Sequence, residues 1–334
     1  MKSMILNENG PIKGSPLVLS DVPVPEPAAG EIRVKVKACG ICRTDLHVIE
    51  GELPLARSPI TPGHQIVGIV DSLGEEAERF EIGDRVGIAW LRHTCGECKY
   101  CIEGKENLCE NSRYTGYHED GGFAEYALVP EAFAYSIPEV FGDSEATPLL
   151  CAGIIGYRAL KRSEIKPRGR LGIFGFGSSA HITAQVARNW GCELYVSTRG
   201  KSHQELARKL GAEWVGGAEE EMPVRVESAI VFAPVGELVL TALRSLEKGG
   251  TLALAGIYMT DIPRMNYTDH LFYEKNLRTV TANTRQDGEE LLLEAAKIPI
   301  RPRIQEFPLE EANRALYLLK QDRISGSGVL VVSG

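Results

Sequence analysis

The chain contains the segment Arg170-Leu171-Gly172-Ile173-Phe174-Gly175-Phe176-Gly177-Ser178-Ser179-Ala180. Its first five residues predict a short buried strand, and the glycines that follow predict a tight turn. Beyond the turn, apolar residues recur at i, i+4 and i+8, as on one face of a helix: Ile182, Val186 and Trp190. A glycine turn that joins a strand to a helix is typical of an alternating α/β fold.

The residues downstream continue the alternation of strand and helix. The expected elements are strands at 192–197, 229–232 and 251–255 and helices at 202–210 and 238–246. Such alternation indicates a doubly wound parallel sheet with helices on both faces, that is, a Rossmann dinucleotide-binding domain. We predict that this domain spans residues 151–283.

The glycine turn fits the pattern G-x-G-x-x-A in the context that this motif requires. Gly175 permits the tight turn, and Gly177 lets a pyrophosphate approach the backbone at the positive end of the helix. Ala180 takes the place of the third glycine and still permits close packing. We therefore assign cofactor binding to Gly175, Gly177, Ser178 and Ser179. The alternative is a strand–helix turn that binds nothing.

The end of the second strand, Ser197-Thr198-Arg199, bears on the choice of nicotinamide cofactor. An NAD site usually has Asp or Glu here to bind the ribose 2′-hydroxyl, and this segment has neither. Hydroxyl groups and a guanidinium suit a 2′-phosphate. The sequence thus favours NADP over NAD, with Ser197, Thr198 and Arg199 as contact residues. For Arg199 the alternative is a solvated loop charge.

The part of the chain before residue 150 has a different pattern, with short strands that follow one another. Apolar and charged residues alternate from Ile32 to Ala38, as in a half-buried strand. We predict a barrel-like β domain over residues 1–150, completed by residues 284–334. Further elements expected in it are strands at 66–70 and 329–332, a turn at 83–86 that leads into another strand, and a helix at 309–319.

The chain has 334 residues, of which 43% are hydrophobic and 25% charged, as in a globular protein of about two domains. A net charge of −8 without a basic run argues against nucleic acid as a partner. The sequence shows no signal peptide and no membrane-spanning apolar window, so we expect a cytoplasmic protein. Its eight cysteines then suggest metal ligands more than disulfides.

Four cysteines lie within fifteen residues and follow the spacing C-x2-C-x2-C-x7-C: Cys95, Cys98, Cys101 and Cys109. Four thiolates on one loop can complete the tetrahedral shell of a zinc ion. Because a closed shell leaves no position for substrate, the pattern indicates a structural zinc site. Two disulfides, four free thiols or an iron–sulfur cluster are the alternatives.

Several further motifs are spread along the chain: Gly40-Ile41-Cys42-Arg43-Thr44-Asp45-Leu46-His47, Pro62-Gly63-His64, Asp120-Gly121-Gly122-Phe123-Ala124-Glu125-Tyr126 and Leu150-Cys151-Ala152-Gly153. With the four-cysteine loop, they stand in the order found in zinc-dependent medium-chain alcohol dehydrogenases, which essentially the whole chain resembles. Segments 232–236 and 308–313 are similar to the bacterial branch. The resemblance implies an α/β protein with a GroES-like β-rich catalytic domain, a Rossmann domain and a cleft between them.

The same resemblance implies a catalytic zinc ion held by Cys42, His64 and Cys151, in addition to the structural one. Three protein ligands leave one position open, and an alcohol bound there loses its proton more easily than in water. The implied reaction transfers hydride between NAD(P) and a small primary or secondary alcohol, or its aldehyde or ketone. Each chain is then expected to hold two zinc ions.

Roles for neighbouring residues follow from the resemblance as well. Thr44 is expected to take the proton of the alcohol, and His47 to pass it to solvent. Asp45 corresponds to the carboxylate that fixes the ring of the histidine ligand. Arg43 corresponds to a residue that contacts the cofactor pyrophosphate, and Trp90 to an aromatic residue of the pocket for small primary alcohols. The alternatives are a surface role for His47 and a core role for Trp90.

The chain departs from the family pattern at three places. Gln65 stands where most members have glutamate after the histidine ligand, so the charge of that side chain is lost. Ile155 replaces a threonine often found near the nicotinamide. Segment 324–329 lacks the arginine usual at its serine positions, which leaves Arg323 as the nearby candidate for a phosphate contact.

Two other functions compete with the alcohol dehydrogenase interpretation. One is an NADPH-preferring aldehyde reductase or polyol dehydrogenase of the same family, although Cys151 and the complete four-cysteine loop argue against the polyol branch. The other is a non-catalytic regulator that binds zinc and a dinucleotide. Family members of this length imply a homotetramer or homodimer.

Overall fold

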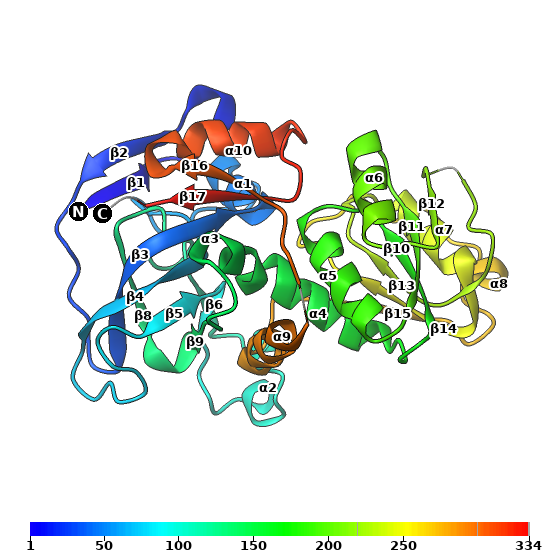
Figure 1. Cartoon of the computed structure of the whole chain (residues 1–334), viewed down its shortest axis with the longest axis horizontal. Coiled ribbons are helices and arrows are strands. Elements are labelled where there is room, and N and C mark those ends of the chain that lie inside the picture. Colours follow the sequence, from blue (N-terminus) through cyan, green and yellow to red (C-terminus); the bar gives the residue numbers. More distant parts are fainter. Residues whose placement is uncertain (219, 299, 333–334) are drawn as a thin grey trace. The chain divides into compact units, whose positions relative to one another are not determined.

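The computed structural model describes residues 1–218, 220–298 and 300–332. The chain forms two compact units, each drawn in Figure 1. Unit 1 comprises Met1–Cys151, Asn283–Leu293 and Pro302–Gly334, and unit 2 comprises Ala152–Ala282 and Glu294–Arg301. Within the described ranges, no helix combines the length and the apolar character needed to cross a bilayer.

Unit 2 is built on a six-stranded parallel sheet. Its strands are β10 (Arg170–Phe174), β11 (Glu193–Ser197), β12 (Trp214–Gly216), β13 (Val226–Val231), β14 (Leu246–Leu254) and β15 (Asn276–Thr279). The order across the sheet is β12-β11-β10-β13-β14-β15, and all neighbours are parallel. The order reverses between β10 and β13, and the glycine turn directly follows β10. A dinucleotide binds at such a reversal, outside the carboxyl ends of the strands.

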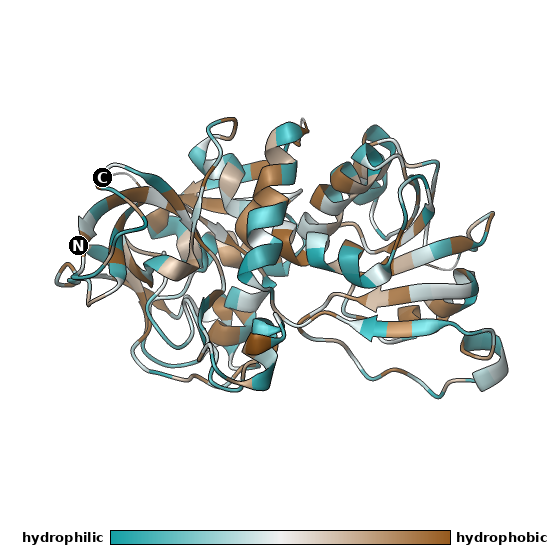
Figure 2. Cartoon of the chain, turned by 90° about the horizontal axis from the view of Figure 1, so that it is seen from below, coloured by the Kyte–Doolittle hydropathy of each residue, from teal (hydrophilic) through white to brown (hydrophobic). Residues whose placement is uncertain are grey.

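Helices connect these strands, as the alternating pattern predicts. They are α4 (Ala152–Ser163), α5 (Ser178–Asn189), α6 (Lys201–Lys209), α7 (Glu237–Ser245) and the short α8 (Tyr267–His270). Ile182 and Val186 on α5 are fully buried, as predicted for its apolar face, whereas the third predicted residue, Trp190, is the half-buried C-cap of the helix. Figure 2 shows the corresponding bands of hydrophobic and hydrophilic residues on the helices. The predicted parallel α/β sheet is confirmed.

Unit 1 contains a seven-stranded, largely antiparallel sheet of order β16-β17-β3-β4-β5-β9, with β8 paired to β3. Its strands are β3 (Glu31–Ile41), β4 (Gln65–Leu73), β5 (Arg85–Ile88), β8 (Tyr126–Pro130), β9 (Ala134–Ser136), β16 (Ile304–Pro308) and β17 (Ser327–Val331). Two small sheets pair β1 (Lys2–Leu6) with β2 (Leu17–Asp21) and β6 (Leu91–His93) with β7 (Arg113–Tyr114). The alternation predicted from Ile32 to Ala38 is confirmed in β3, where the apolar residues are buried.

Short helices surround this sheet. The α-helices are α1 (Arg43–Glu50), α2 (Lys99–Ile102), α3 (Asp143–Ala146) and α10 (Ala312–Lys320), and the 3-10 turns are η1 (Ile12–Gly14), η2 (Glu106–Leu108), η3 (Glu131–Phe133), η4 (Thr147–Leu150) and η5 (Leu309–Glu311). The helix expected at 309–319 therefore begins with a 3-10 turn. Helix α10 lies against β16 and β17 in Figure 1, so the C-terminal segment completes the first unit.

Beyond residue 283 the structure contains a helix that the sequence pattern did not predict, α9 (Arg285–Lys297). Its sequence begins with polar residues, Arg-Gln-Asp-Gly-Glu-Glu, so no long apolar stripe marks its start. The first part of α9, through Leu293, belongs to unit 1, and Glu294–Arg301 belong to unit 2. The predicted segment 284–334 included these eight residues, whereas in the structure they belong to the other unit.

One glycine of unit 1 shapes the approach to a predicted metal ligand. Gly63 has φ +98°, and a Cβ built on it would lie 2.4 Å from the ring of Phe123. Only glycine therefore fits both the backbone conformation and the space at this position. The N–H groups of Gly122 and Phe123 also donate to the carbonyls of Gly63 and Pro62, which fixes the backbone directly before His64.

Candidate metal centres and cofactor turn

The structure brings Cys42, His64 and Cys151 together from three distant segments of unit 1. Cys42 precedes α1, His64 precedes β4, and Cys151 lies between η4 and α4. The Cys42 Sγ atom lies 3.3 Å from His64 Nε2 and 4.0 Å from Cys151 Sγ. All three ligand atoms lie within 4.8 Å of one another.

These separations test whether the three side chains fit a zinc ion. Zn–S and Zn–N bonds of about 2.3 and 2.1 Å give tetrahedral edges of about 3.5 to 3.8 Å. The observed 3.3 and 4.0 Å bracket these edges. Two sulfurs and one imidazole nitrogen also form a donor set that zinc accepts. The residues fit a zinc ion with one coordination position left for another ligand.

Asp45 supports two members of this cluster from the first turn of α1. Its Oδ1 atom lies 3.1 Å from Nδ1 of His64, and both side chains are only 1% exposed. Its Oδ2 atom accepts a hydrogen bond of 2.8 Å from the backbone N–H of Cys42. The carboxylate therefore fixes the imidazole so that Nε2 faces the two sulfurs, the arrangement usual for a metal-ligating histidine.

The protonation of the cluster follows from these contacts. Burial alone would lower the pKa of His64, but the negative charges of Asp45 and Cys42 raise it to about 10. A hydrogen bond from the Cys151 thiol places the pKa of Cys42 well below its ordinary value, and the same bond, with burial, raises the pKa of Cys151. A metal ion that enters this cluster must displace the protons of His64 and Cys151.

The four-cysteine loop forms a second cluster in unit 1, around α2 and η2. Cys95 Sγ lies 3.9 Å from Cys101 Sγ and 3.5 Å from Cys109 Sγ, and Cys98 and Cys101 are 3.6 Å apart. These distances match tetrahedral edges around zinc and far exceed a disulfide bond of about 2.05 Å. All eight cysteines of the chain are free, so the disulfide alternative is wrong.

Two cysteines of the four-cysteine loop have pKa values that differ from the ordinary value of a thiol. Hydrogen bonds from the backbone of Glu97 and Cys98 lower the pKa of Cys95 to about 7. Burial contributes most to raising the pKa of Cys101, to about 11. Cys95 is thus partly ionised near neutral pH, whereas Cys101 must lose its proton on binding.

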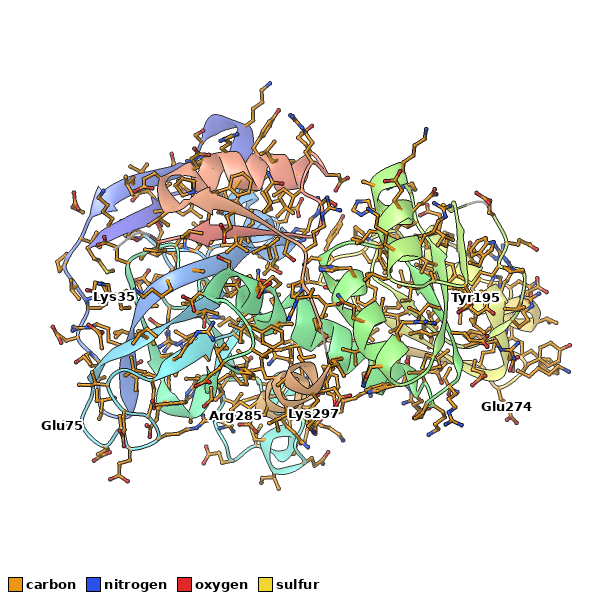
Figure 3. The ribbon with its side chains drawn as sticks, viewed as in Figure 1. Lys35, Glu75, Tyr195, Glu274, Arg285 and Lys297 are labelled. Carbon is orange, nitrogen blue, oxygen red and sulfur yellow. The ribbon has the colours of Figure 1, made fainter. Side chains whose placement is uncertain are left out.

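Glu106, between the third and fourth cysteines, connects the loop to the start of α9. Its buried carboxylate accepts hydrogen bonds from the backbone N–H of Arg285 at 2.7 Å and from the Arg285 guanidinium at 2.7 to 3.2 Å. The guanidinium also lies 4.6 Å above the ring of Phe133. Figure 3 labels Arg285 at the beginning of α9. This contact was not anticipated, because it joins residues 179 positions apart.

Thr44 and His47 lie one turn apart on α1, so their side chains share one side of the helix. Thr44 is buried, and its backbone N–H donates to Cys42 Sγ at 3.3 Å. His47 is 15% exposed, and its Nδ1 pairs with the carboxylate of Glu52. Glu52 was not among the predicted residues, although it follows His47 by only five positions.

Trp90 touches the histidine ligand directly. Its ring centroid lies 4.9 Å from that of His64 in an edge-to-face arrangement. Tyr114 and Tyr117 stack against Trp90 at centroid distances of 4.9 and 5.9 Å, and the Tyr117 hydroxyl donates to the Pro54 carbonyl at 2.8 Å. An aromatic wall therefore stands beside the cluster, of which the sequence pattern indicated only Trp90.

The glycine turn of unit 2 has room for a phosphate. Gly175 has φ +88°, and a Cβ on it would lie 2.9 Å from the Ala233 backbone. A Cβ on Gly177 would meet nothing within 4 Å. Gly177 is the N-cap of α5, whose first residues are Ser178 and Ser179. Open space at the positive N-terminal end of a helix fits a pyrophosphate.

The other predicted cofactor contacts have different surroundings. The Ser197 hydroxyl donates to the Gly217 carbonyl at 3.0 Å, and the Thr198 hydroxyl donates to the Arg199 carbonyl at 3.4 Å. Arg199 itself is exposed. In unit 1, Arg43 is exposed at the start of α1 and forms an ion pair with Asp322. The ion pair engages one terminal nitrogen of the guanidinium, so its other N–H groups remain for a phosphate.

Comparison with known proteins agrees with both units. The family model described as an alcohol dehydrogenase GroES-like domain matches residues 28–139, and that described as a zinc-binding dehydrogenase matches residues 180–297. A relative named probable alcohol dehydrogenase AdhA, from Mycobacterium tuberculosis, is 52% identical over 99% of this chain and 97% of its own length.

Solved structures have the same fold. A proposed zinc-binding dehydrogenase from Sinorhizobium meliloti 1021, bound to NADP, is 28% identical with a TM-score of 0.88, over 99% of this chain and 98% of that chain. Acetophenone reductase from Geotrichum candidum, in complex with NAD, is 25% identical with a TM-score of 0.87, over 99% of this chain and 96% of that chain.

The similarity extends over nearly the whole chain, and the expected GroES-like and Rossmann folds are both confirmed. Because the matching family is one of zinc-binding dehydrogenases, zinc describes the four-cysteine loop better than an iron–sulfur cluster does. The two-unit fold, the cysteine and histidine clusters and the extent of sequence identity agree with one another. The chain belongs to the family of zinc-dependent medium-chain alcohol dehydrogenases.

Proposed function

We propose that this protein interconverts small primary or secondary alcohols and their aldehydes or ketones, and that it uses NADP(H) in preference to NAD(H). The proposal depends chiefly on the convergence of Cys42, His64 and Cys151 within 4.8 Å, with one ligand position left for a substrate oxygen. The second cluster, in the four-cysteine loop, offers a closed shell and is assigned a structural role.

Zinc held by these three residues would supply a Lewis acid that makes an alcohol hydroxyl more acidic, and a bound nicotinamide would supply the hydride acceptor or donor. The protein holds the ligands in place: Asp45 fixes His64 through Nδ1 and Cys42 through its backbone N–H. The Thr44 hydroxyl receives the substrate proton, and His47 passes it toward solvent, with the exposed Glu52 carboxylate beside its Nδ1.

The direct test is an assay of nicotinamide absorbance with ethanol, benzyl alcohol and sorbitol, each with both cofactors. We expect turnover of the first two alcohols and little turnover of sorbitol. If zinc-replete protein binds cofactor but turns over none of them, the enzyme proposal is wrong and a non-catalytic regulator is the better description. Rapid turnover of sorbitol would instead favour a polyol dehydrogenase.

Asp45→Asn is expected to weaken the catalytic zinc about 10- to 100-fold, the usual effect of losing a carboxylate behind a histidine ligand. Asparagine can still accept the hydrogen bond from Cys42, but it carries no charge opposite His64. The measurement is zinc released to a chelator over time. The zinc of the four-cysteine loop serves as the internal control and should leave at the wild-type rate. Unchanged release of both ions would contradict the assigned role of Asp45.

Arg199→Asp is expected to shift the preference from NADP toward NAD by at least about tenfold in the ratio of kcat/KM values, an effect of about 1.4 kcal/mol. The reason is that Arg199 is exposed beyond β11, whereas the hydroxyls of Ser197 and Thr198 already donate to backbone carbonyls. Lys201→Asp is a matched change of charge two residues away and should alter the ratio less. An unchanged ratio would remove Arg199 from the cofactor site.

For the assembly, we propose a homodimer or homotetramer in which β15 pairs with a second copy. This strand is at the edge of its sheet, and apolar side chains beside it are exposed: Phe272 54%, Tyr273 43% and Leu277 37%. An edge with unpaired backbone groups and apolar residues favours pairing with another chain. Leu277→Asp should lower the mass measured by light scattering, whereas Leu293→Asp, at another exposed leucine, should not. A monomeric wild type would refute the proposal.

A further inference from the structure

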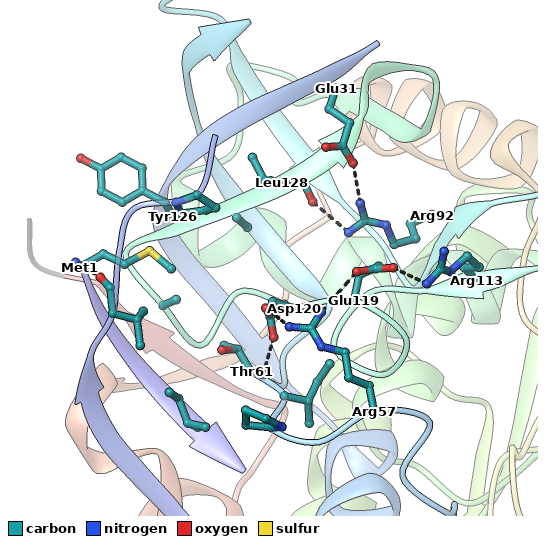
Figure 4. A pocket seen from close by; sticks show the side chains of 18 of the residues that line it. Met1, Glu31, Arg57, Thr61, Arg92, Arg113, Glu119, Asp120, Tyr126 and Leu128 are labelled. Atoms are coloured by element: carbon teal, nitrogen blue, oxygen red, sulfur yellow. Dashed lines mark hydrogen bonds and ion pairs between the residues drawn. The ribbon is translucent and has the colours of Figure 1, made fainter. Parts of the chain in front are cut away.

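Unit 1 contains a cavity of about 600 Å³ to which the proposed reaction assigns no role (Figure 4). None of the ligands Cys42, His64 and Cys151 lines it. Its walls come from the N-terminal strands, from the segment before His64, and from β6, β7 and β8. The volume is within the range of cavities that hold small molecules.

One side of the cavity is apolar. Ile5 and Tyr126 are partly exposed there, whereas Ile60, Ala124 and Ala127 are buried with at most 3% exposed surface. Such a surface favours the hydrocarbon part of a ligand, because contact removes it from water.

The opposite side carries arginines, of which Arg92 is buried with 6% exposed surface. Its guanidinium donates to Glu31 and to the Leu128 carbonyl, each at 3.0 Å. A guanidinium has five N–H groups, so three of them make no hydrogen bond to the described part of the chain. A buried guanidinium with unused donors can bind an anion at little further cost of desolvation.

Arg113 adds a second positive charge near Arg92. Burial lowers the pKa of Arg92, the carboxylate of Glu31 opposes this, and the charge of Arg113 lowers it further. Arg113 pairs with Glu119, and the same carboxylate also serves Arg57 at 3.3 Å. Figure 4 shows Glu119 between the side chains of Arg57 and Arg113. Glu119 also raises the pKa of Arg92, so its carboxylate already offsets the repulsion between Arg92 and Arg113. What remains for a ligand is the set of guanidinium N–H donors from which no described residue accepts.

We propose that this cavity binds a small carboxylate with an apolar body. Its carboxylate accepts hydrogen bonds from the unused N–H groups of Arg92 and from Arg113, and its hydrocarbon part contacts the apolar surface of Ile5 and Tyr126. A planar guanidinium matches a planar carboxylate, which accepts two parallel hydrogen bonds. An ammonium group has no acceptor for these donors.

The test uses the zinc-replete enzyme and 4-fluorobenzoate, whose binding is followed by the broadening of its fluorine NMR signal. We expect saturable binding that Arg113→Gln weakens about tenfold, the effect of losing a charge-assisted hydrogen bond. Arg113 is 53% exposed and pairs with Glu119 through its side chain, so the variant should fold. Lys13→Gln removes one exposed positive charge outside the cavity and should bind like the wild type.

Two other probes separate charge from hydrophobicity. 4-Fluorobenzylamine has nearly the same body with the opposite charge and should not compete. Inorganic phosphate carries the charge without an apolar body and should compete much more weakly. The proposal is overturned by absent saturation, by equal binding to wild type and Arg113→Gln, which would place the carboxylate elsewhere, or by equal competition from either probe.

Discussion

Cys151→Ala is expected to lower kcat/KM by about three orders of magnitude or more, because it removes one of three ligands that hold the catalytic zinc. A Lewis acid contributes several kcal/mol to the barrier, and each 1.36 kcal/mol is about tenfold in rate. Cys151 is well suited to the experiment, since its thiol donates to Cys42 Sγ at 4.0 Å. Its cap of η4 is made by the backbone N–H, which donates to the Pro148 carbonyl and is kept in alanine. Metal analysis of the variant should give one zinc ion per chain.

The matched control is Cys192→Ala, which removes another thiol that lies outside both clusters and contacts the Lys166 carbonyl at 3.6 Å. This variant should keep both zinc ions and nearly all activity. Circular dichroism should show that each variant folds, and cofactor titration should show that unit 2 is intact. Full turnover by Cys151→Ala, or loss of both zinc ions from it, would refute the assignment of the two clusters.

Cys98→Ser is expected to have the opposite profile: a large loss of stability with the chemistry preserved. Zinc held by the four-cysteine loop would stabilise the folded protein to the extent that it binds the ordered loop more tightly than the unfolded chain. We expect the melting temperature to fall by on the order of 10 °C, as for other losses of a structural metal. Well below that temperature, kcat should change little, because a closed shell takes no substrate.

Glu103→Gln provides the control within the same loop. Glu103 is exposed and pairs only with Lys105 among the described residues, so its loss should leave zinc content and melting temperature unchanged. The measurements are zinc content, calorimetry and initial rates at low temperature. If Cys98→Ser lost activity in proportion to its loop zinc while its melting temperature stayed the same, the loop would have a catalytic role.

The sequence predicted those parts of the fold that depend on patterns among neighbouring residues. Strand–helix alternation after residue 170 and the glycine turn at Gly175 predicted the parallel sheet, because both depend on neighbouring residues. Helix α9 was missed, since its polar start has no periodic apolar face. The boundaries of β11, α6 and α7 differ from the predicted ones by one residue at most.

The candidate site was predictable in a different way. Spacing alone identified the four-cysteine loop, whose ligands are local, whereas Cys42, His64 and Cys151 came from family resemblance and have no common spacing. Contacts such as those of Tyr117 with Trp90 depend on how distant segments fold together. No local pattern encodes them, so only the three-dimensional structure could reveal them.

The pairing of Glu106 with Arg285 has a consequence for the order in which the chain is completed. During synthesis, residues 95–109 can close around a metal ion long before Arg285 has been made. The buried Glu106 carboxylate then has no counter-ion, and an unpaired buried charge is costly. The Glu106 carboxylate therefore gains its counter-ion only after residues 152–282 of unit 2 have been synthesised and Arg285 has followed. The stability of unit 1 in the finished protein depends on a segment, residues 283–293, that is translated only after most of unit 2.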